Sequence, residues 1–154
     1  MIINNSVRTY VPIIPLYFNG CLFMNANYEI PEEMAKLFTK GLEALSKHLY
    51  EKNINPTKLF PVSLVFTKDG SFSVTENETN TYGRCMSFLV YSMERMIASN
   101  NQHMQLFVFI EELVHYYFQE TNEIKVKLTT FSVVQKIFPE ITFEEVGSWR
   151  VNWN

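Results

Sequence analysis

The segment between His103 and Glu120 constrains the fold most, because its side chains are apolar with few interruptions. If it is drawn as a helix, apolar residues occur at nearly every angle around the axis, so the helix must be packed on most sides. These apolar residues are Leu106, Phe107, Val108, Phe109, Ile110, Leu113, Val114, Tyr116, Tyr117 and Phe118. The sequence therefore predicts a central helix over residues 103–120.

Other helices are expected on both sides of this segment. Residues 31–53 begin with a proline and two acids, which favour a helix start, and continue with apolar residues at helical spacing. The same spacing predicts a helix over residues 84–99. Residues 124–127 are expected to be extended and to lead into a last helix over 129–138, which the following proline ends.

The N-terminal region contains the first of two predicted β-hairpins. Residues 14–18 and 21–25 flank Asn19 and Gly20, the dipeptide that best tolerates the positive φ angles of a type I′ turn. A hairpin is the expected structure. The C-terminal tail alternates Trp149, Val151 and Trp153, which suits a strand or an extended arm.

The second predicted hairpin covers residues 62–75. A three-residue loop with Gly70 in the left-handed conformation would align Phe66 with Phe72 and Leu64 with Val74, so apolar side chains share one face. The expected fold class is therefore α+β: a small, mostly antiparallel sheet of hairpins packed against three to four helices.

Size and composition indicate a single domain spanning residues 1–154. The net charge is −3, and the chain has no run of basic residues that could neutralise a row of phosphates, so nucleic acid is not the expected partner. The N-terminus does not resemble a signal peptide, and no apolar stretch is long enough to cross a bilayer. The expected location is the cytoplasm, with no membrane association.

One group of residues in the central helix carries chemical information. Glu111, Glu112 and His115 are ionisable side chains in an otherwise apolar segment, so each needs a partner, a cavity or solvent. Glu111 and His115 are four residues apart and share a helix face, which would let both reach one ion. The pattern is that of H-E-x-x-H with glutamate in place of the first histidine.

This pattern resembles that of the zincin metallopeptidases, and in particular the bacterial ImmA/IrrE-like proteins, which cleave phage and stress-response repressors. That group carries H-E-x-x-H on a helix, followed by a glutamate that is the third zinc ligand. Residues 123–139, with the sequence EIKVKLTTFSVVQKIFP, resemble the stretch that contains this third ligand. The order of elements, a helix and then a hairpin before the motif helix, is also similar. The resemblance implies a zincin-like fold.

The resemblance also implies roles for individual residues. His115 would be a metal ligand, Glu112 the general base that activates metal-bound water, and Glu123 the third ligand. Glu111 departs from the family pattern, because it would supply a carboxylate where the family has an imidazole. Two carboxylates and one imidazole could bind zinc, but this set also suits harder divalent ions.

Two functional interpretations therefore stay open. The first is a degenerate zincin-like domain whose metal-dependent peptidase chemistry is lost or weakened. The alternative is a small intracellular module that binds a protein partner and has no catalytic activity. In both, a carboxylate from Glu111, Glu112 or Glu123 is expected within hydrogen-bond or shared-ion reach of the His115 ring, since an unpartnered buried ring would cost about 1 to 3 kcal/mol. Glu111 is the first choice for this partner.

Overall fold

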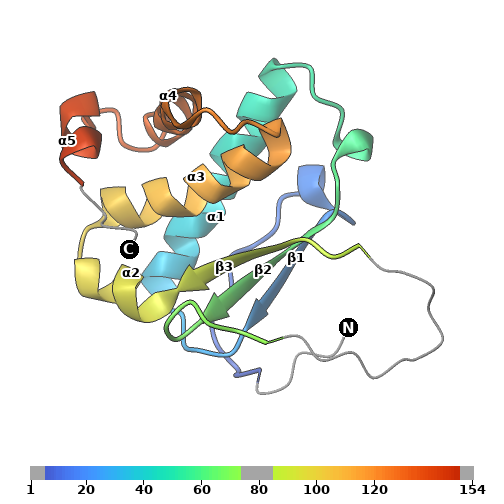
Figure 1. Cartoon of the computed structure of the whole chain (residues 1–154), viewed down its shortest axis with the longest axis vertical. Helices are drawn as coiled ribbons and strands as arrows, with labels where there is room; N and C mark the ends of the chain where they lie inside the picture. The colour runs from blue at the N-terminus through green and yellow to red at the C-terminus, as the bar shows by residue number, and fades with distance from the viewer. Residues whose placement is uncertain (1–5, 74–84, 150–154) are drawn as a thin grey trace.

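The computed structural model describes residues 6–73 and 85–149. In these ranges three strands and five α-helices form an α+β fold (Figure 1). The strands are β1 (Leu22–Ala26), β2 (Val62–Thr67) and β3 (Phe88–Ser92). The helices are α1 (Glu32–Glu51), α2 (Met93–Ser99), α3 (Gln102–Phe118), α4 (Glu123–Val134) and α5 (Phe143–Ser148), and two short 3-10 helices occupy Leu16–Phe18 and Pro56–Lys58.

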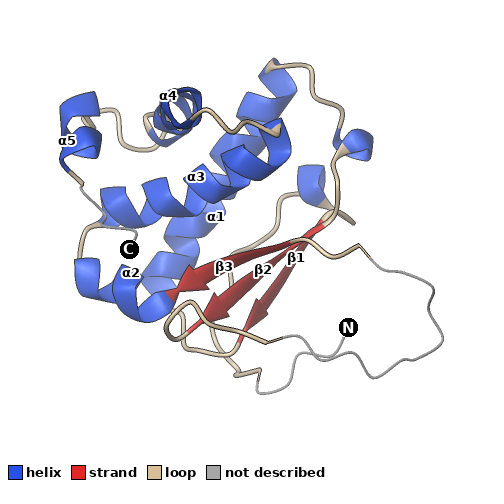
Figure 2. Cartoon of the chain, viewed as in Figure 1, coloured by secondary structure: helices blue, strands red, loops and turns tan. Residues whose placement is uncertain are grey.

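The three strands form a parallel sheet in the order β1, β2, β3 (Figure 2). Leu64 in the central strand β2 is aligned with Met24 in β1 and with Leu89 in β3. The predicted antiparallel sheet of hairpins is therefore wrong, and so is the zincin-like fold expected with it. Neighbouring strands are instead joined by long crossovers, as parallel pairing requires.

The first predicted hairpin fails at its turn. Asn19 has φ −60° and ψ 128°, and Gly20 has φ 79°. These are the angles of a type II turn, which does not match the twist of a two-stranded hairpin as a type I′ turn does. The residues before the turn form the Leu16–Phe18 3-10 helix, so β1 has no partner there and pairs with β2.

The second predicted hairpin is correct only in its glycine. Gly70 has the expected positive φ of 88°, but residues 71–73 form no strand. Phe66 is aligned with Ala26 and Tyr91 on the two neighbouring strands, and not with Phe72. Both edges of β2 are thus occupied by distant segments, whose pairing a local turn pattern does not reveal. Val74 lies outside the described residues.

Two of the four helix predictions are confirmed. The helix expected over residues 31–53 is α1, with two glutamates in its first turn, and the central helix expected over 103–120 is α3. The helix expected over 84–99 is wrong in its first half, because residues 88–92 form β3 and only the remainder is helical, as α2. A short apolar run such as Phe-Leu-Val-Tyr fits both periodicities.

The predicted boundary between an extended segment and the last helix is also wrong. Residues 124–127 are helical, because α4 already begins at Glu123 and ends at Val134. The Asn122 side chain accepts hydrogen bonds from the backbone N–H groups of Ile124 and Lys125, which is the arrangement of an N-cap. Trp149 directly follows the short helix α5, and the remainder of the predicted C-terminal arm lies outside the described residues.

The core forms where α1 and α3 pack on one face of the sheet. The Phe38 ring of α1 stacks on the Phe109 ring of α3 with centroids 4.1 Å apart, and both rings lie near Phe66 of β2. Tyr91 of β3 adds a fourth ring and donates a hydrogen bond to the Phe109 carbonyl oxygen. In the part of the chain described, no helix is both long and apolar enough to cross a membrane.

Candidate functional site

Helix α3 buries one face in the core and presents its ionisable residues on the other. The core face contributes Leu106, Phe109, Ile110 and Leu113, all fully buried. Glu111, Glu112 and His115 are only half-buried and belong to the opposite side. The apolar residues thus hold the helix against α1 and the sheet, while the ionisable side chains line its exposed edge.

The turn from α3 to α4 brings a second acidic residue beside His115. Gln119 takes the left-handed conformation that ends α3, and α4 starts four residues later. Glu123, the first residue of α4, then lies with its carboxylate Oε1 3.6 Å from Nε2 of His115. The other ring nitrogen of His115, Nδ1, is 2.9 Å from the backbone carbonyl oxygen of Glu120. Because a carbonyl only accepts, Nδ1 carries the proton and Nε2 is directed toward the Glu123 side.

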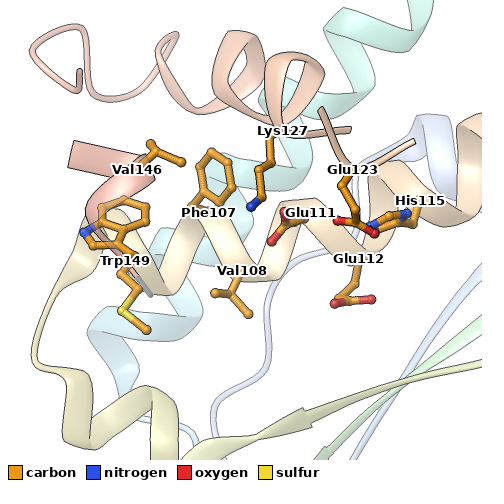
Figure 3. Close-up of a pocket in the computed structure, with 10 residues that line it drawn as sticks. Phe107, Val108, Glu111, Glu112, His115, Glu123, Lys127, Val146 and Trp149 are labelled. Carbon is orange, nitrogen blue, oxygen red and sulfur yellow. The ribbon is translucent and has the colours of Figure 1, made fainter. Parts of the chain in front are cut away.

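All four residues singled out in the sequence line one pocket of about 310 Å³ (Figure 3). Helix α3 forms its floor, α4 contributes one wall, and the α5 region closes one end. The lining residues are Met104, Phe107, Val108, Glu111, Glu112, His115, Glu123, Lys127, Val146 and Trp149. The pocket therefore combines three carboxylates, an imidazole and an ammonium with an apolar end.

The Glu111 carboxyl is the least well accommodated group in this pocket. Its Oε1 atom is buried without a hydrogen-bond partner among the described residues. Burial raises the pKa of Glu111 above its usual value, and the nearby Lys127 ammonium, which Figure 3 shows directed toward Glu111, opposes this shift. An unpaired buried oxygen is costly, so this site favours a ligand that can approach Glu111 as a donor or a cation.

Glu112 lies between this pocket and a second hollow of about 300 Å³, which Leu89 and Tyr116 also line. Burial raises the pKa of Glu112, His115 lowers it and Glu123 raises it further. Figure 3 shows the Glu112 carboxylate directed away from those of Glu111 and Glu123. The residue expected to be a general base therefore does not face the point where the other carboxylates meet.

The predicted ligands are brought together only in part. Glu123, and not the first choice Glu111, forms the ion-pair contact with His115. Within residues 6–73 and 85–149, no three His, Cys, Asp or Glu side chains are close enough together to hold one metal ion. Three residues that the sequence did not single out also line the pocket: Phe107, Lys127 and Val146. Lys127 follows Glu123 by one helical turn, a relation hidden when residues 124–127 are taken as extended.

Comparison with known protein families, with curated proteins and with solved structures finds no match to this chain.

Proposed function

We propose that the pocket between α3 and α4 binds a divalent metal ion through Glu111, His115 and Glu123, as a hydrolase-type site whose peptidase chemistry is lost or weakened. The observation that carries this proposal is the hydrogen bond between His115 Nδ1 and the Glu120 carbonyl oxygen. Metal-binding histidines commonly donate one ring N–H to a carbonyl or carboxylate, which leaves the other nitrogen as the ligand. His115 has this arrangement.

The distance between His115 and Glu123 supports the same interpretation. Two ligands of one tetrahedral ion, each bound at about 2.1 Å, lie about 3.4 Å apart. The His115 Nε2 and Glu123 Oε1 atoms are 3.6 Å apart. A neutral His115 with its proton on Nδ1 presents a lone pair to an anionic carboxylate, and a cation between the two atoms would remove that repulsion.

Glu111 would complete the ligand set after a change of side-chain rotamer, because its unpartnered oxygen lines the same pocket. The resulting set of two carboxylates and one imidazole suits zinc, manganese or iron, and such an ion would act as a Lewis acid that makes a bound water more acidic. In this chain the carboxylates keep more negative charge beside the ion than three neutral ligands would, which weakens that effect.

The orientation of Glu112 is the second reason to expect weak hydrolysis. A general base must lie within hydrogen-bond reach of the water that it deprotonates. Glu112 instead faces the side of the second hollow, toward Leu89 and Tyr116. We therefore infer a site that binds an ion more readily than it cleaves a peptide.

Metal analysis of protein purified without a histidine tag tests this function. After supplementation with zinc, manganese or iron, about one ion per chain is expected, together with a rise in melting temperature that depends on metal concentration. Both should be lost in His115→Ala and Glu111→Ala. Glu144→Ala, on the exposed side of α5, is the matched control and should retain both. Metal-free protein after supplementation with all three ions would contradict the proposal.

A protein-interaction module is the second candidate function, and an exposed apolar surface favours it. Ile124 and Leu128 lie one turn apart on α4 with exposed fractions of 69% and 50%, and Phe143 of α5 is 45% exposed. Phe131 joins them through an edge contact with the Phe143 ring. Leu128→Ser leaves the pocket residues in place, so it should abolish partner binding without changing metal content. The opposite result would favour the metal site.

A further inference from the structure

A histidine outside the candidate metal site is held between two carboxylates. His103, the second residue of α3, has Nδ1 2.9 Å from Glu145 Oε1 and Nε2 3.2 Å from Glu140 Oε1. Glu145 belongs to α5, and Glu140 lies in the turn that leads from α4 to α5. One imidazole therefore connects the start of α3 to two points of the C-terminal segment.

The hydrogen-bond donors of the ring set a condition on this arrangement. Neutral imidazole has one N–H group, whereas the protonated ring has two. Both carboxylates can accept a hydrogen bond only from the protonated form. When the ring is neutral, one nitrogen lone pair faces a carboxylate oxygen at about hydrogen-bond distance, and this contact is repulsive.

The surroundings of His103 contain few other charges. Glu140 and Glu145 face the ring from the C-terminal segment, the Phe138 ring packs against it with centroids 4.4 Å apart, and the amino end of α3 contributes a positive helix dipole. The two carboxylates favour a protonated ring, and the dipole opposes it. In the described residues neither carboxylate forms an ion pair with a lysine or arginine, so His103 is the cation that they share.

The segment that His103 holds covers one end of the pocket. Val146 of α5 and the following Trp149 both line it, and the Trp149 ring rests edge-on against Phe107. Buried Ile141 and Val146 attach the segment to the domain independently of His103. Loss of one hydrogen bond would thus loosen α5 without unfolding it.

We propose that His103 is a proton-dependent latch for α5: the protonated ring holds Glu140 and Glu145 together and keeps α5 against the end of the pocket, and loss of one proton to solvent releases one carboxylate and opens that end. Histidine side chains exchange this proton between about pH 5 and 8. The segment is therefore closed on the acidic side of this range and looser on the basic side. The latch does not depend on the metal-binding function.

Hydrogen exchange of α5 and fluorescence quenching of Trp149 test the latch, both with a chelator present. Trp149 becomes the sole tryptophan in a Trp153→Phe background, since the chain has 2. Between pH 5.5 and 8, after correction for intrinsic exchange rates, α5 amides should exchange about threefold to tenfold faster, as expected for loss of one charge-assisted hydrogen bond. Acrylamide should quench Trp149 more strongly over the same range.

The His103→Gln variant should abolish this pH dependence, because glutamine does not titrate. Glu140→Gln changes a side chain that is 65% exposed, so it should fold normally and should also reduce the dependence. Glu144→Gln removes a neighbouring charge that does not touch His103, and should behave as wild type. A wild-type response that is flat, or one that persists unchanged in Glu140→Gln and His103→Gln, would overturn the proposal.

Discussion

The two sides of α3 differ in almost every physical respect. On the side of the sheet and α1, the Phe38, Phe66 and Phe109 rings are fully buried and stacked on one another. On the side of α4 and α5, the half-buried Glu111 has an oxygen without a partner, and the pocket lies open. One helix thus contributes to a close-packed core and to an incompletely satisfied polar site.

This difference separates stability from function within a single element. Close-packed aromatic rings contribute dispersion and burial to the folded state. Buried carboxyls without partners cost free energy, and proteins retain such costs mainly at sites where a ligand or a proton later compensates them. Substitutions on the two sides of α3 should therefore have opposite effects on the stability of the metal-free protein.

Phe109→Ala on the core side should have the largest effect. It removes a fully buried ring that stacks on Phe38 at 4.1 Å, and should lower the free energy of unfolding by about 3 to 5 kcal/mol. Urea denaturation followed by circular dichroism measures this loss. Phe143→Ala is the matched control in the pocket region, because its ring is 45% exposed, and it should cost less than about 1 kcal/mol. Equal losses would refute the contrast between the two sides.

Gly41→Ala probes how closely α1 approaches α3 and should have an intermediate effect. A Cβ at Gly41 would lie 2.6 Å from Leu106 Cδ1 and 3.1 Å from Ile110 Cδ1, both in fully buried side chains. The crowding should cost about 1 to 3 kcal/mol, which exceeds the gain in helix propensity of up to about 1 kcal/mol.

Gly147→Ala is the control for helix propensity, because a Cβ there meets no atom within 4 Å. It should leave α5 unchanged or slightly stabilise it. A melting temperature that rises in both glycine variants would show that the contact between α1 and α3 can relax around an added methyl group.

Glu111→Gln on the pocket side should have the smallest effect and the opposite sign. Burial raises the folded-state pKa of Glu111 above its unfolded value, so the native state binds its proton more tightly than the unfolded state. Stability is then complete below the unfolded pKa and decreases as pH rises through the raised folded value. Glutamine removes this penalty and should stabilise metal-free protein at pH 8 by about 0.5 to 1 kcal/mol, a figure that allows for solvent screening.

The pH profile of the unfolding free energy distinguishes this effect from a general gain. Wild type and Glu111→Gln should converge near pH 4, where the carboxyl is protonated in both states, and should diverge toward pH 8. Glu43→Gln on the exposed face of α1 is the control and should follow wild type throughout. A Glu111→Gln variant that is less stable at pH 8 would mean that the Lys127 ammonium compensates the carboxylate fully.

Much of the helical structure was predictable because helix signals are local. The acids after Pro31 and the apolar spacing beyond them indicated α1, and the apolar run indicated α3. The start of α4 was missed, although Asn122 is an ordinary N-cap residue. The alternation from Ile124 to Lys127 was interpreted as extended, and the cap that overrides it was not weighed.

The candidate site shows the same division. The four-residue spacing of Glu111 and His115 placed them on one face of a helix, and they line one pocket as expected. The contact of His115 with Glu123 depends on the turn at Gln119, whose left-handed backbone no pattern around it predicts. Lys127, Val146 and Trp149 reach the pocket only through the packing of α4 and α5 on α3.

The sequence by itself determined which segments are apolar enough to be buried and which of them are helical, because helix hydrogen bonds and caps join residues within about four positions. It did not determine the partners of the strands. Val62–Thr67 reads as a strand in isolation, but the choice between a hairpin and two parallel neighbours depends on segments about 20 to 40 residues away. Only the tertiary structure decided that choice, since burying β2 against α1 and α3 is what brings β1 and β3 to its two edges.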